Sequence, residues 1–277
     1  MRKIPSYPLF LLLFLFILAP MGAFAASVGS PETLGGFGKV AVGLEYDSLS
    51  QPLKLTSGSI TRDVFREDFT ASNMDMKTRT TYLVGTVGIL PTMDAFFALG
   101  INRAKIGLSA DYIGGASDDI SVTDNSNLAY KLGVKGRIME VSGINLNGML
   151  QYAAFKMNGR FSVNGMDLDA FYDRDATYST KTHVREWQAA LTASKQMGRF
   201  SPYLGATWRR TSVSNTTAIQ VTDVEGSYEV FFNAKAKEDH ALDAVIGTGV
   251  MITEHLGAGV EYQPQNKEGA ISASYAF

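Results

Sequence analysis

The sequence predicts an all-β protein, a transmembrane antiparallel up-and-down β-barrel of about ten strands with long extracellular loops and short periplasmic turns. Three observations lead to this fold class. Several segments alternate apolar and polar residues with a period of two, which is typical of strands that face two environments. Beyond the N-terminus, no apolar run approaches the roughly 20 residues of a spanning helix. The connections between the alternating segments are long and short by turns.

The N-terminal residues have the layout of a cleaved secretory signal peptide. A positive start (MRK) precedes an apolar run over residues 9–18, and the small residues of "AFA" suit a cleavage site after Ala25. The sequence is therefore predicted to consist of a signal peptide (1–25), a periplasmic lead (26–37) and the barrel (38–277). The chain has no cysteine, so disulfides cannot hold the exported fold.

Composition excludes several functions. The formal net charge of −2 lacks the basic excess of a nucleic-acid-binding protein, so no nucleic acid is expected as a partner. No Walker loop, zinc-ligand cluster or serine elbow occurs in the chain. We therefore expect no cofactor, no metal site and no enzymatic activity.

Ten segments are predicted to be strands: 38–47, 78–90, 95–112, 127–140, 144–157, 182–196, 202–213, 240–252, 256–263 and 269–277. The first has Val40, Val42 and Leu44 on one face. The faces of the second are left open, because Tyr82 and Val84 compete with the residues on the other side. In the third, the apolar series from Phe97 gives way to one that starts at Ala104, which predicts a bulge near Asn102. The apolar series of this third strand are Phe97, Leu99 and Ile101, then Ala104, Ile106 and Leu108.

The later strands follow in order, each with an apolar face and a small or polar one. The apolar faces of the fourth, fifth, sixth and eighth begin at Leu128, Ile144, Trp187 and Leu242. The seventh completes the hairpin "EWQAALTASKQMGRFSPYLGATWRR", and the ninth and tenth form a short hairpin at the C-terminus.

The lengths of the connections set the architecture. The odd-numbered connections are predicted to be 48–77, 113–126, 158–181, 214–239 and the short 264–268. The even-numbered ones are 91–94, 141–143, 197–201 and 253–255. Long connections that alternate with short ones are typical of a membrane barrel with outward loops and periplasmic turns. Two outward loops contain hairpin signals, at Asn164-Gly165 and within 218–232 around Glu225-Gly226.

In lipid every backbone N–H and C=O needs a partner, so a spanning sheet must close. The last strand is expected to pair with the first near Val42. Apolar faces are assigned to lipid and polar faces to the lumen. Aromatic residues near strand ends are assigned to interfacial girdles: Tyr46, Tyr112, Trp187, Tyr203, Trp208, Tyr262 and Tyr275.

These features resemble Gram-negative outer-membrane β-barrel proteins, in particular small opacity-type and porin-like barrels. The resemblance covers nearly all of 38–277. It implies placement in the outer membrane, with outer-membrane lipid and lipopolysaccharide around the barrel. It also implies that periplasmic chaperones and the barrel-assembly machinery are partners during biogenesis, and that this machinery recognises the last strand. The implied assembly signal is a terminal phenylalanine with outward residues at alternate positions: Ile271, Ala273, Tyr275 and Phe277.

The leading functional hypothesis is a porin-like barrel with a narrow channel for small solutes. Both signs of charge are expected inside, and ten strands are close to the size at which side chains fill the lumen. The predicted lumen-lining residues are Lys39, Glu45, Lys131, Lys135, Arg137, Glu186, Gln188, Arg209, Asp243 and Glu261.

Two alternatives remain open. The first is a closed structural or adhesive surface barrel that acts through loops 48–77, 158–181 and 214–239. The second is an outer-membrane protease of the omptin kind, which ten strands superficially resemble. Asp239-His240, with His183, Asp173 and Asp175, are the candidates at the outward rim. Adjacent strand residues face opposite sides, so Asp239 and His240 are not expected to act together. Oligomeric state is left open.

Overall fold

The computed structural model describes residue 34 and the ranges 36–62, 65–112, 116–167, 176–223 and 226–277. The predicted signal peptide and most of the 26–37 lead lie outside these residues. The described end of the lead is bound to the barrel, since the Leu34 N–H donates to Asp94 Oδ2 at 2.9 Å. The Gly38 N–H donates to the Gly88 carbonyl at 2.8 Å. Within the described residues, no helix has the length and apolar character needed to cross a membrane.

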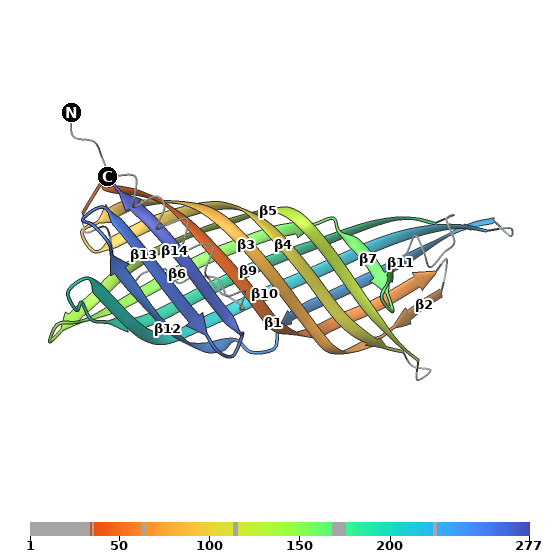
Figure 1. Cartoon of the computed structure of the whole chain (residues 1–277). Coiled ribbons are helices and arrows are strands. Elements are labelled where there is room, and N and C mark those ends of the chain that lie inside the picture. The colour runs from red at the N-terminus through yellow and green to blue at the C-terminus, as the bar shows by residue number, and fades with distance from the viewer. Residues whose placement is uncertain (1–33, 35, 63–64, 113–115, 168–175, 224–225) are drawn as a thin grey trace, which may run out of the picture.

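Ten strands close into a ring, as predicted (Figure 1). In chain order they are β1 (Val40–Arg62), β3 (Thr70–Leu90), β4 (Met93–Asp111), β5 (Ser117–Val141), β6 (Ile144–Met157), β9 (Ala176–Ser194), β10 (Phe200–Asp223), β12 (Leu242–Met251), β13 (Leu256–Gln263) and β14 (Glu268–Ala276). Each pairs antiparallel with the next, and β14 pairs with β1, with Tyr275 opposite Val42. The expected closure of the last strand on the first is confirmed, and it leaves the ring without an open edge.

Four further strands extend the wall at the end remote from the C-terminus: β2 (Phe65–Asp68), β7 (Arg160–Val163), β8 (Met166–Asp167) and β11 (Gly226–Glu238) (Figure 1). β11 pairs with both β1 and β10 at the end remote from the C-terminus. At that end it closes the gap between β1 and β10 that β12–β14 close nearer the C-terminus. Both hairpins predicted in the loops are confirmed. β7 and β8 turn at Asn164-Gly165, with φ angles of 51° and 77°, and β10 pairs directly with β11.

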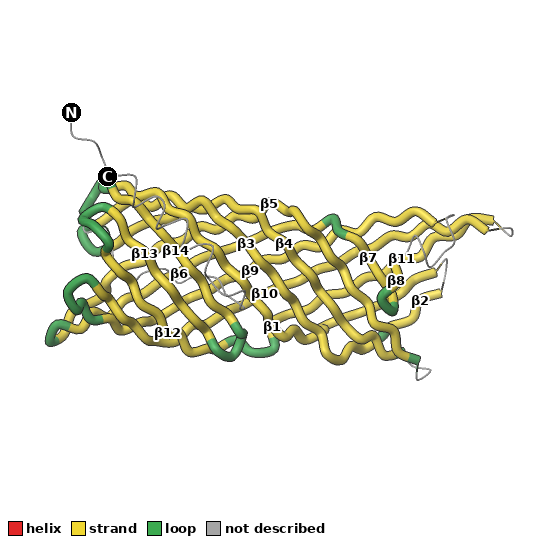
Figure 2. Tube along the Cα trace, viewed as in Figure 1, coloured by secondary structure: helices red, strands yellow, loops and turns green. Residues whose placement is uncertain are grey.

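The prediction of long loops is wrong. Most described residues of 48–77, 158–181 and 214–239 are strand, and Figure 2 shows only short loops between long strands. The first strand, predicted over 38–47, continues to Arg62, and the seventh, predicted over 202–213, continues to Asp223. These stretches were missed because the expected pattern, apolar outside and polar inside, applies only where the barrel faces lipid.

The polarity of the barrel inverts along single strands, and β4 shows it clearly. Its inward and outward positions alternate without a break from Phe97 to Leu108. Near the periplasmic end the exposed side is apolar, with Leu99 and Ile101 46% and 62% exposed. Beyond Asn102 the exposed side becomes basic, and the buried side becomes apolar. The outer surface therefore changes from one that suits lipid to one that suits water.

The bulge expected near Asn102 is only partly right. The β4–β5 register does shift there, since Asn102 is opposite Asn127 whereas Ala104 is opposite Asp124. The additional residue, however, is on β5 and not on β4. The apparent slip in β4 is therefore a change of environment at constant register, because Ile106 and its alternate neighbours are buried inside the barrel.

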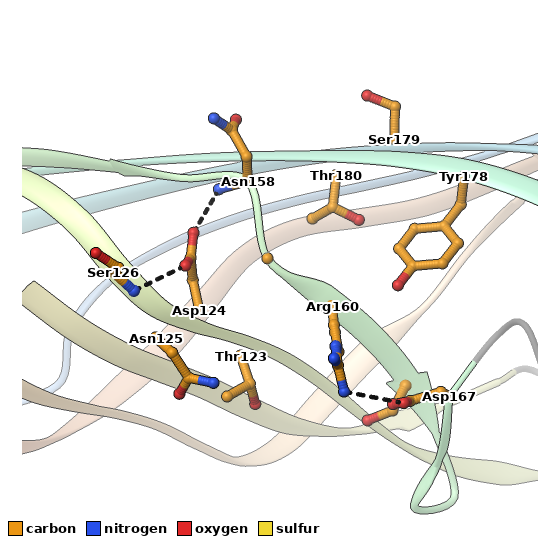
Figure 3. A pocket seen from close by; sticks show the side chains of 12 residues that line it. Thr123, Asp124, Asn125, Ser126, Asn158, Arg160, Asp167, Tyr178, Ser179 and Thr180 are labelled. Carbon is orange, nitrogen blue, oxygen red and sulfur yellow. Dashed lines mark hydrogen bonds and ion pairs between the residues drawn. The ribbon is translucent and has the colours of Figure 1, made fainter.

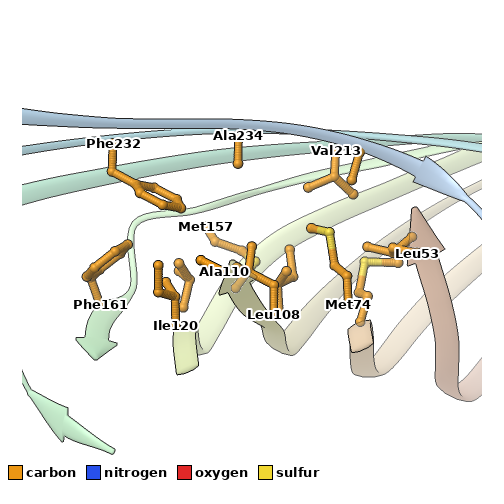
Figure 4. Close-up of a cluster of buried hydrophobic side chains, with 14 of the residues drawn as sticks. Leu53, Met74, Leu108, Ala110, Ile120, Met157, Phe161, Val213, Phe232 and Ala234 are labelled. Carbon is orange, nitrogen blue, oxygen red and sulfur yellow. The ribbon is translucent and has the colours of Figure 1, made fainter. Parts of the chain in front are cut away.

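An apolar cluster fills the extracellular half of the barrel (Figure 4). Phe232 of β11 belongs to it, with its ring 5.1 Å from that of Phe69 and 5.3 Å from that of Phe161. Side chains from β1, β3, β4, β5, β6, β9 and β10 complete the cluster. Outside the membrane this half needs a core like that of a soluble barrel, because burial of apolar area drives folding in water.

Phe232→Ala should lower the free energy of unfolding by about 3–5 kcal/mol, because it leaves a cavity in this cluster. Phe231 is the matched control, since it is adjacent in sequence but 37% exposed on the outer face. Phe231→Ala should cost less than about 1 kcal/mol. Denaturant unfolding of the refolded barrel in detergent measures both, and equal losses would contradict an apolar core.

Two of the aromatic assignments are wrong. Tyr203 is buried inside the barrel with 4% exposure, and Tyr112 packs against the apolar cluster. Trp187, Tyr262 and Tyr275 are between 44% and 48% exposed, as a membrane-facing girdle requires.

Candidate functional site

The middle of the lumen contains buried charged side chains in two clusters. Two cations, Lys131 and Arg209, are each only 1% exposed. Among the described residues the buried carboxylates at this level and at the adjoining β13–β14 turn are Glu45, Asp47, Glu186, Asp243, Glu261 and Glu268. Charge in a dry interior is costly unless it is paired, so the pairing decides what this site can do.

The first cluster is centred on Lys131 of β5. Its Nζ contacts Glu45 Oε1 and lies 3.5 Å from Asp47 Oδ2, both on β1. The Nζ also lies 4.6 Å from the centre of the Tyr82 ring, a cation–π contact. Gly100 makes room for that ring, because a Cβ there would lie 2.6 Å from Tyr82 Cδ1. One cation therefore joins two carboxylates across strands β1 and β5.

The second cluster is centred on Arg209 of β10. Its guanidinium contacts Glu268 of β14, and its Nε lies 3.5 Å from Glu186 Oε1 of β9. The Thr211 hydroxyl lies 3.1 Å from Glu186 Oε2 and 3.3 Å from Gln51 Oε1. Through this hydroxyl, the second cluster is linked to β1, the strand that carries the carboxylates of the first.

Amide and hydroxyl side chains of further strands form a third bonded group in the lumen. Gln151 Nε2 donates to Gln188 Oε1 at 2.5 Å, and Gln188 Nε2 is 3.5 Å from Gln263 Oε1. Gln263 in turn donates to Glu261 at 3.0 Å, and the Tyr203 hydroxyl donates to the same carboxylate at 2.8 Å. The lumen is thus crossed by three groups of bonded side chains, the two charged clusters and this chain of amides and hydroxyls, which together are called the polar network.

Two hollows lie on either side of the Lys131 cluster. A periplasmic hollow of about 280 Å³ reaches Glu45, and its lining includes Asp94 and Lys135. A cavity of about 40 Å³ lies beyond it, lined by Asp47, Lys131 and Glu186 among others. The contact between Glu45 and Lys131 therefore separates the periplasmic hollow from the centre of the barrel.

The structure brings most of the predicted lumen-lining residues together, but not all. Glu45, Lys131, Glu186, Gln188, Arg209 and Glu261 are buried and belong to the network described above. Asp243 is buried too, but it accepts the N–H groups of Gln265 and Asn266 and so holds the β13–β14 turn.

Three predicted residues lie apart from the network, toward the periplasmic end. Lys39 and Arg137 are exposed, and Lys135 is half-buried. Arg137 pairs with Glu140 at 3.0 Å. Lys135 and Arg137 follow Lys131 at alternate positions of β5, which is why they were predicted to line the lumen. The barrel is open to water at this end, so their side chains are not buried there as Lys131 is.

Sequence reasoning missed several members of the site, notably Asp47, Tyr82 and Glu268. Asp47 is two residues after Glu45, and Glu268 shares the predicted inward face of Ser272 and Ser274. Period two alone could have found both, since Asp47 is the last residue of the predicted strand 38–47 and Glu268 lies one residue before the predicted strand 269–277. Tyr82 could not be assigned, because both faces of its strand are rich in apolar residues.

The predicted assembly signal lies on β14 and the residue that follows it. Tyr275 and Phe277 are 48% and 75% exposed, and their rings meet edge to face at 5.2 Å. Ile271 and Ala273 are half-buried, opposite Tyr46 and Leu44 of β1. The Phe277 N–H donates to the Val40 carbonyl at 2.9 Å, which ties the chain end to the first strand.

The residues considered for protease chemistry are not gathered in the lumen. Asp239 and His240 lie in a bend before β12 and not in a strand, so the expectation that they face opposite sides is wrong. Their side chains are 3.6 Å apart, but both are about half exposed. His183 is opposite the exposed Lys156 and Ser214, and Asp173 and Asp175 lie outside the described residues.

A separate hollow of about 750 Å³ opens beside β5 and β9, where β6 has ended (Figure 3). Its polar groups largely bond one another. Asp124 accepts the N–H groups of Asn158 and Ser126, and Arg160 lies 3.8 Å from Asp167 (Figure 3). We treat it as a solvated surface feature, separate from the charged centre.

Comparison with known sequences places this barrel among outer-membrane proteins. A family profile described as Chlamydia major outer membrane protein matches residues 121–254, just under half of the chain. The major outer membrane porin of Chlamydia trachomatis serovar L1 is 26% identical over 256 residues, which cover 70% of this chain and 65% of the porin. That of serovar D is 26% identical over 177 residues, 54% of this chain and 45% of the porin. The chain thus spans less than two thirds of these relatives.

Two solved structures of outer-membrane proteins align with most of this chain. The outer membrane protein OprG of Pseudomonas aeruginosa has a TM-score of 0.46 at 11% identity, over 87% of this chain and 96% of that one. The outer membrane protease OmpT of Escherichia coli has a TM-score of 0.41 at 13% identity, over 85% and 97%. With its closed ring and its similarity to the chlamydial porins, the chain is a porin-like β-barrel protein of the outer membrane.

Proposed function

We propose that the protein provides a narrow, cation-preferring path for small solutes across the outer membrane, and that in this structure the Lys131 cluster closes the periplasmic half of the path, below the apolar cluster. The observation that carries the proposal is the pair of hollows separated by the contact between Glu45 and Lys131. The buried charges include more carboxylates than cations, so the lumen favours cations.

Planar-bilayer recording of the refolded barrel tests the proposal. The double variant Glu45→Ala/Lys131→Ala removes both partners of the separating ion pair and shortens both side chains. It should show larger single-channel conductance than the wild type and a higher permeability ratio of K⁺ to Cl⁻, because Asp47 keeps its charge. Asp47 loses its cation in this variant, so heat-modifiable mobility on gels is used to confirm that the barrel has folded before it is recorded.

The matched control is Arg66→Ala/Asp68→Ala, which removes an exposed ion pair of 3.0 Å at the extracellular end. Its conductance should equal that of the wild type. Absence of discrete openings in both the wild type and the Glu45/Lys131 variant would contradict a path through the lumen.

A closed surface barrel is the second candidate, because the apolar cluster fills the extracellular half of the lumen. In that case the Glu45/Lys131 variant would stay silent in bilayers, while the extracellular hairpins would carry the binding activity. Surface digestion of whole cells at these hairpins, followed by a cell-binding assay, is the direct measurement.

We further propose that residues 1–25 are removed on export and that the barrel-assembly machinery recognises Ile271, Ala273, Tyr275 and Phe277. The support is the signal-peptide layout of the sequence and the outward exposure of Tyr275 and Phe277 at the end of the closing strand. The mass of the chain isolated from outer membranes checks the first part. Lipopolysaccharide is proposed as the lipid around the upper rim of the apolar band.

A further inference from the structure

Four basic side chains form a square on the outer face of the barrel. Lys77 and Arg79 lie on β3, and Lys105 and Arg103 are their direct cross-strand partners on β4. All four are exposed. Like charges placed directly opposite on neighbouring strands destabilise a sheet, so the square is unfavourable unless an anion occupies it.

The protein itself provides little compensation. Asp75 lies 3.1 Å from Lys77, but this exposed pair contributes little. Among the described residues, Arg79, Arg103 and Lys105 have no hydrogen bond or ion pair to a side chain. Ser48 and Ser50 of β1 are the neighbours of Arg79 and Lys77, so the flank of the square carries hydroxyl groups and no acid.

The square lies immediately above the lipid-facing band. The next outward pair along these strands is Thr81 and Ile101, and Leu83 and Leu99 follow, 58% and 46% exposed. A lipid whose acyl chains cover Leu83 and Leu99 therefore brings its headgroup to the level of Arg79 and Arg103. Arginine binds phosphate through two parallel N–H donors, which suits a phosphorylated headgroup.

We propose that Lys77, Arg79, Arg103 and Lys105 form a binding site for a lipid headgroup that carries two phosphates. The proposal rests on the outer-membrane placement of the barrel and goes beyond the lipopolysaccharide proposal above by assigning the residues. Two phosphates match the two arginines, and the lysines hold the same anions from the row above. The site is independent of the lumen, so it stands whether or not the barrel conducts.

The test uses the full barrel refolded in zwitterionic detergent and titrated with diphosphoryl lipid A, monophosphoryl lipid A and inorganic phosphate in separate arms. Native mass spectrometry measures binding. The wild type should bind diphosphoryl lipid A about tenfold or more tightly than Arg79→Gln/Arg103→Gln. Monophosphoryl lipid A should bind more weakly to the wild type, and inorganic phosphate at equal phosphate concentration should not displace the lipid.

Arg66→Gln/Arg160→Gln is the charge-matched control, because both arginines lie on β2 and β7, far from the band. It should bind as the wild type does. A second measurement keeps the test independent of folding yield: without anionic lipid, Arg79→Gln/Arg103→Gln should melt no lower than the wild type, because repulsion is relieved. With diphosphoryl lipid A, only the wild type and the control should gain thermal stability.

Three outcomes overturn the proposal. Equal affinity of the wild type and Arg79→Gln/Arg103→Gln means that the square does not bind the headgroup. Equal loss in the control means that only overall charge matters. Displacement by inorganic phosphate means that the site takes a free anion and not a lipid. None of these outcomes bears on conductance, so failure here is distinct from failure of the channel proposal.

Discussion

Lys131→Met should destabilise the barrel by about 3–5 kcal/mol, which is more than a hundredfold in the folding equilibrium. Methionine keeps an unbranched side chain, one heavy atom shorter than lysine, but removes the charge. Glu45 and Asp47 are then left buried on one strand face without their cation. Two carboxylates without a counter-charge in a dry lumen repel each other and cannot be solvated. Denaturant unfolding at neutral pH, followed by heat-modifiable mobility on gels, measures the loss.

The triple variant Glu45→Gln/Asp47→Asn/Lys131→Met separates charge from packing. It keeps the shapes of the two carboxylate side chains and the methionine of the single variant but removes every charge, and it should recover most of the lost stability. Lys195→Met, at an exposed periplasmic turn, is the neutral control. If the triple variant is as unstable as Lys131→Met, the cation stabilises the barrel through its packing and not through its charge.

Deletion of Phe277 should reduce the folded barrel in the outer membrane to well under a tenth of the wild-type level. The deletion removes the exposed terminal ring, its edge-to-face contact with Tyr275, and the hydrogen bond to the Val40 carbonyl. It also removes the residue proposed as the centre of the assembly signal. Quantification of heat-modifiable barrel in isolated outer membranes measures the effect.

Phe277→Tyr retains the aromatic ring and the backbone hydrogen bond, so it should assemble at close to the wild-type level. Ser274→Ala changes the opposite face of the same strand and should also assemble normally. Wild-type amounts of folded barrel from the Phe277 deletion would show that closure of β14 on β1 is sufficient. Refolding of the same deletion in detergent separates a loss of recognition from a loss of stability.

Period-two alternation was sufficient wherever a strand faces lipid. The predicted bounds of β6 and β13, 144–157 and 256–263, agree with the structure, and the ring has the predicted ten strands. The lipid-facing residues of β5 and β12, such as Leu128 and Leu242, are 70% and 65% exposed on the outer face. Every outward position that faces lipid must be apolar, and this pattern can be recognised in a single strand without knowledge of the strands beside it.

Prediction from the same alternation was wrong above the membrane, because there the apolar face of a strand points into the barrel and the polar face points outward. Ile106 and Leu108 continue the register of β4 but point into an apolar core, and the stretch from Lys54 to Arg62 is strand and not loop. Which face is inside depends on whether water or lipid lies outside, and a single strand does not contain that information.

The sequence by itself determined the fold class, the number of strands in the ring and the closure of β14 on β1. Only the tertiary structure decided which charges meet. Lys131 lies 86 residues from Glu45 in the chain, and Arg209 lies 59 residues from Glu268. The shear of a closed ring sets the height at which each strand presents its inward residues, so cross-lumen pairs follow from register and not from local pattern. The basic square on β3 and β4 arises in the same way, because each strand supplies only two of its four charges.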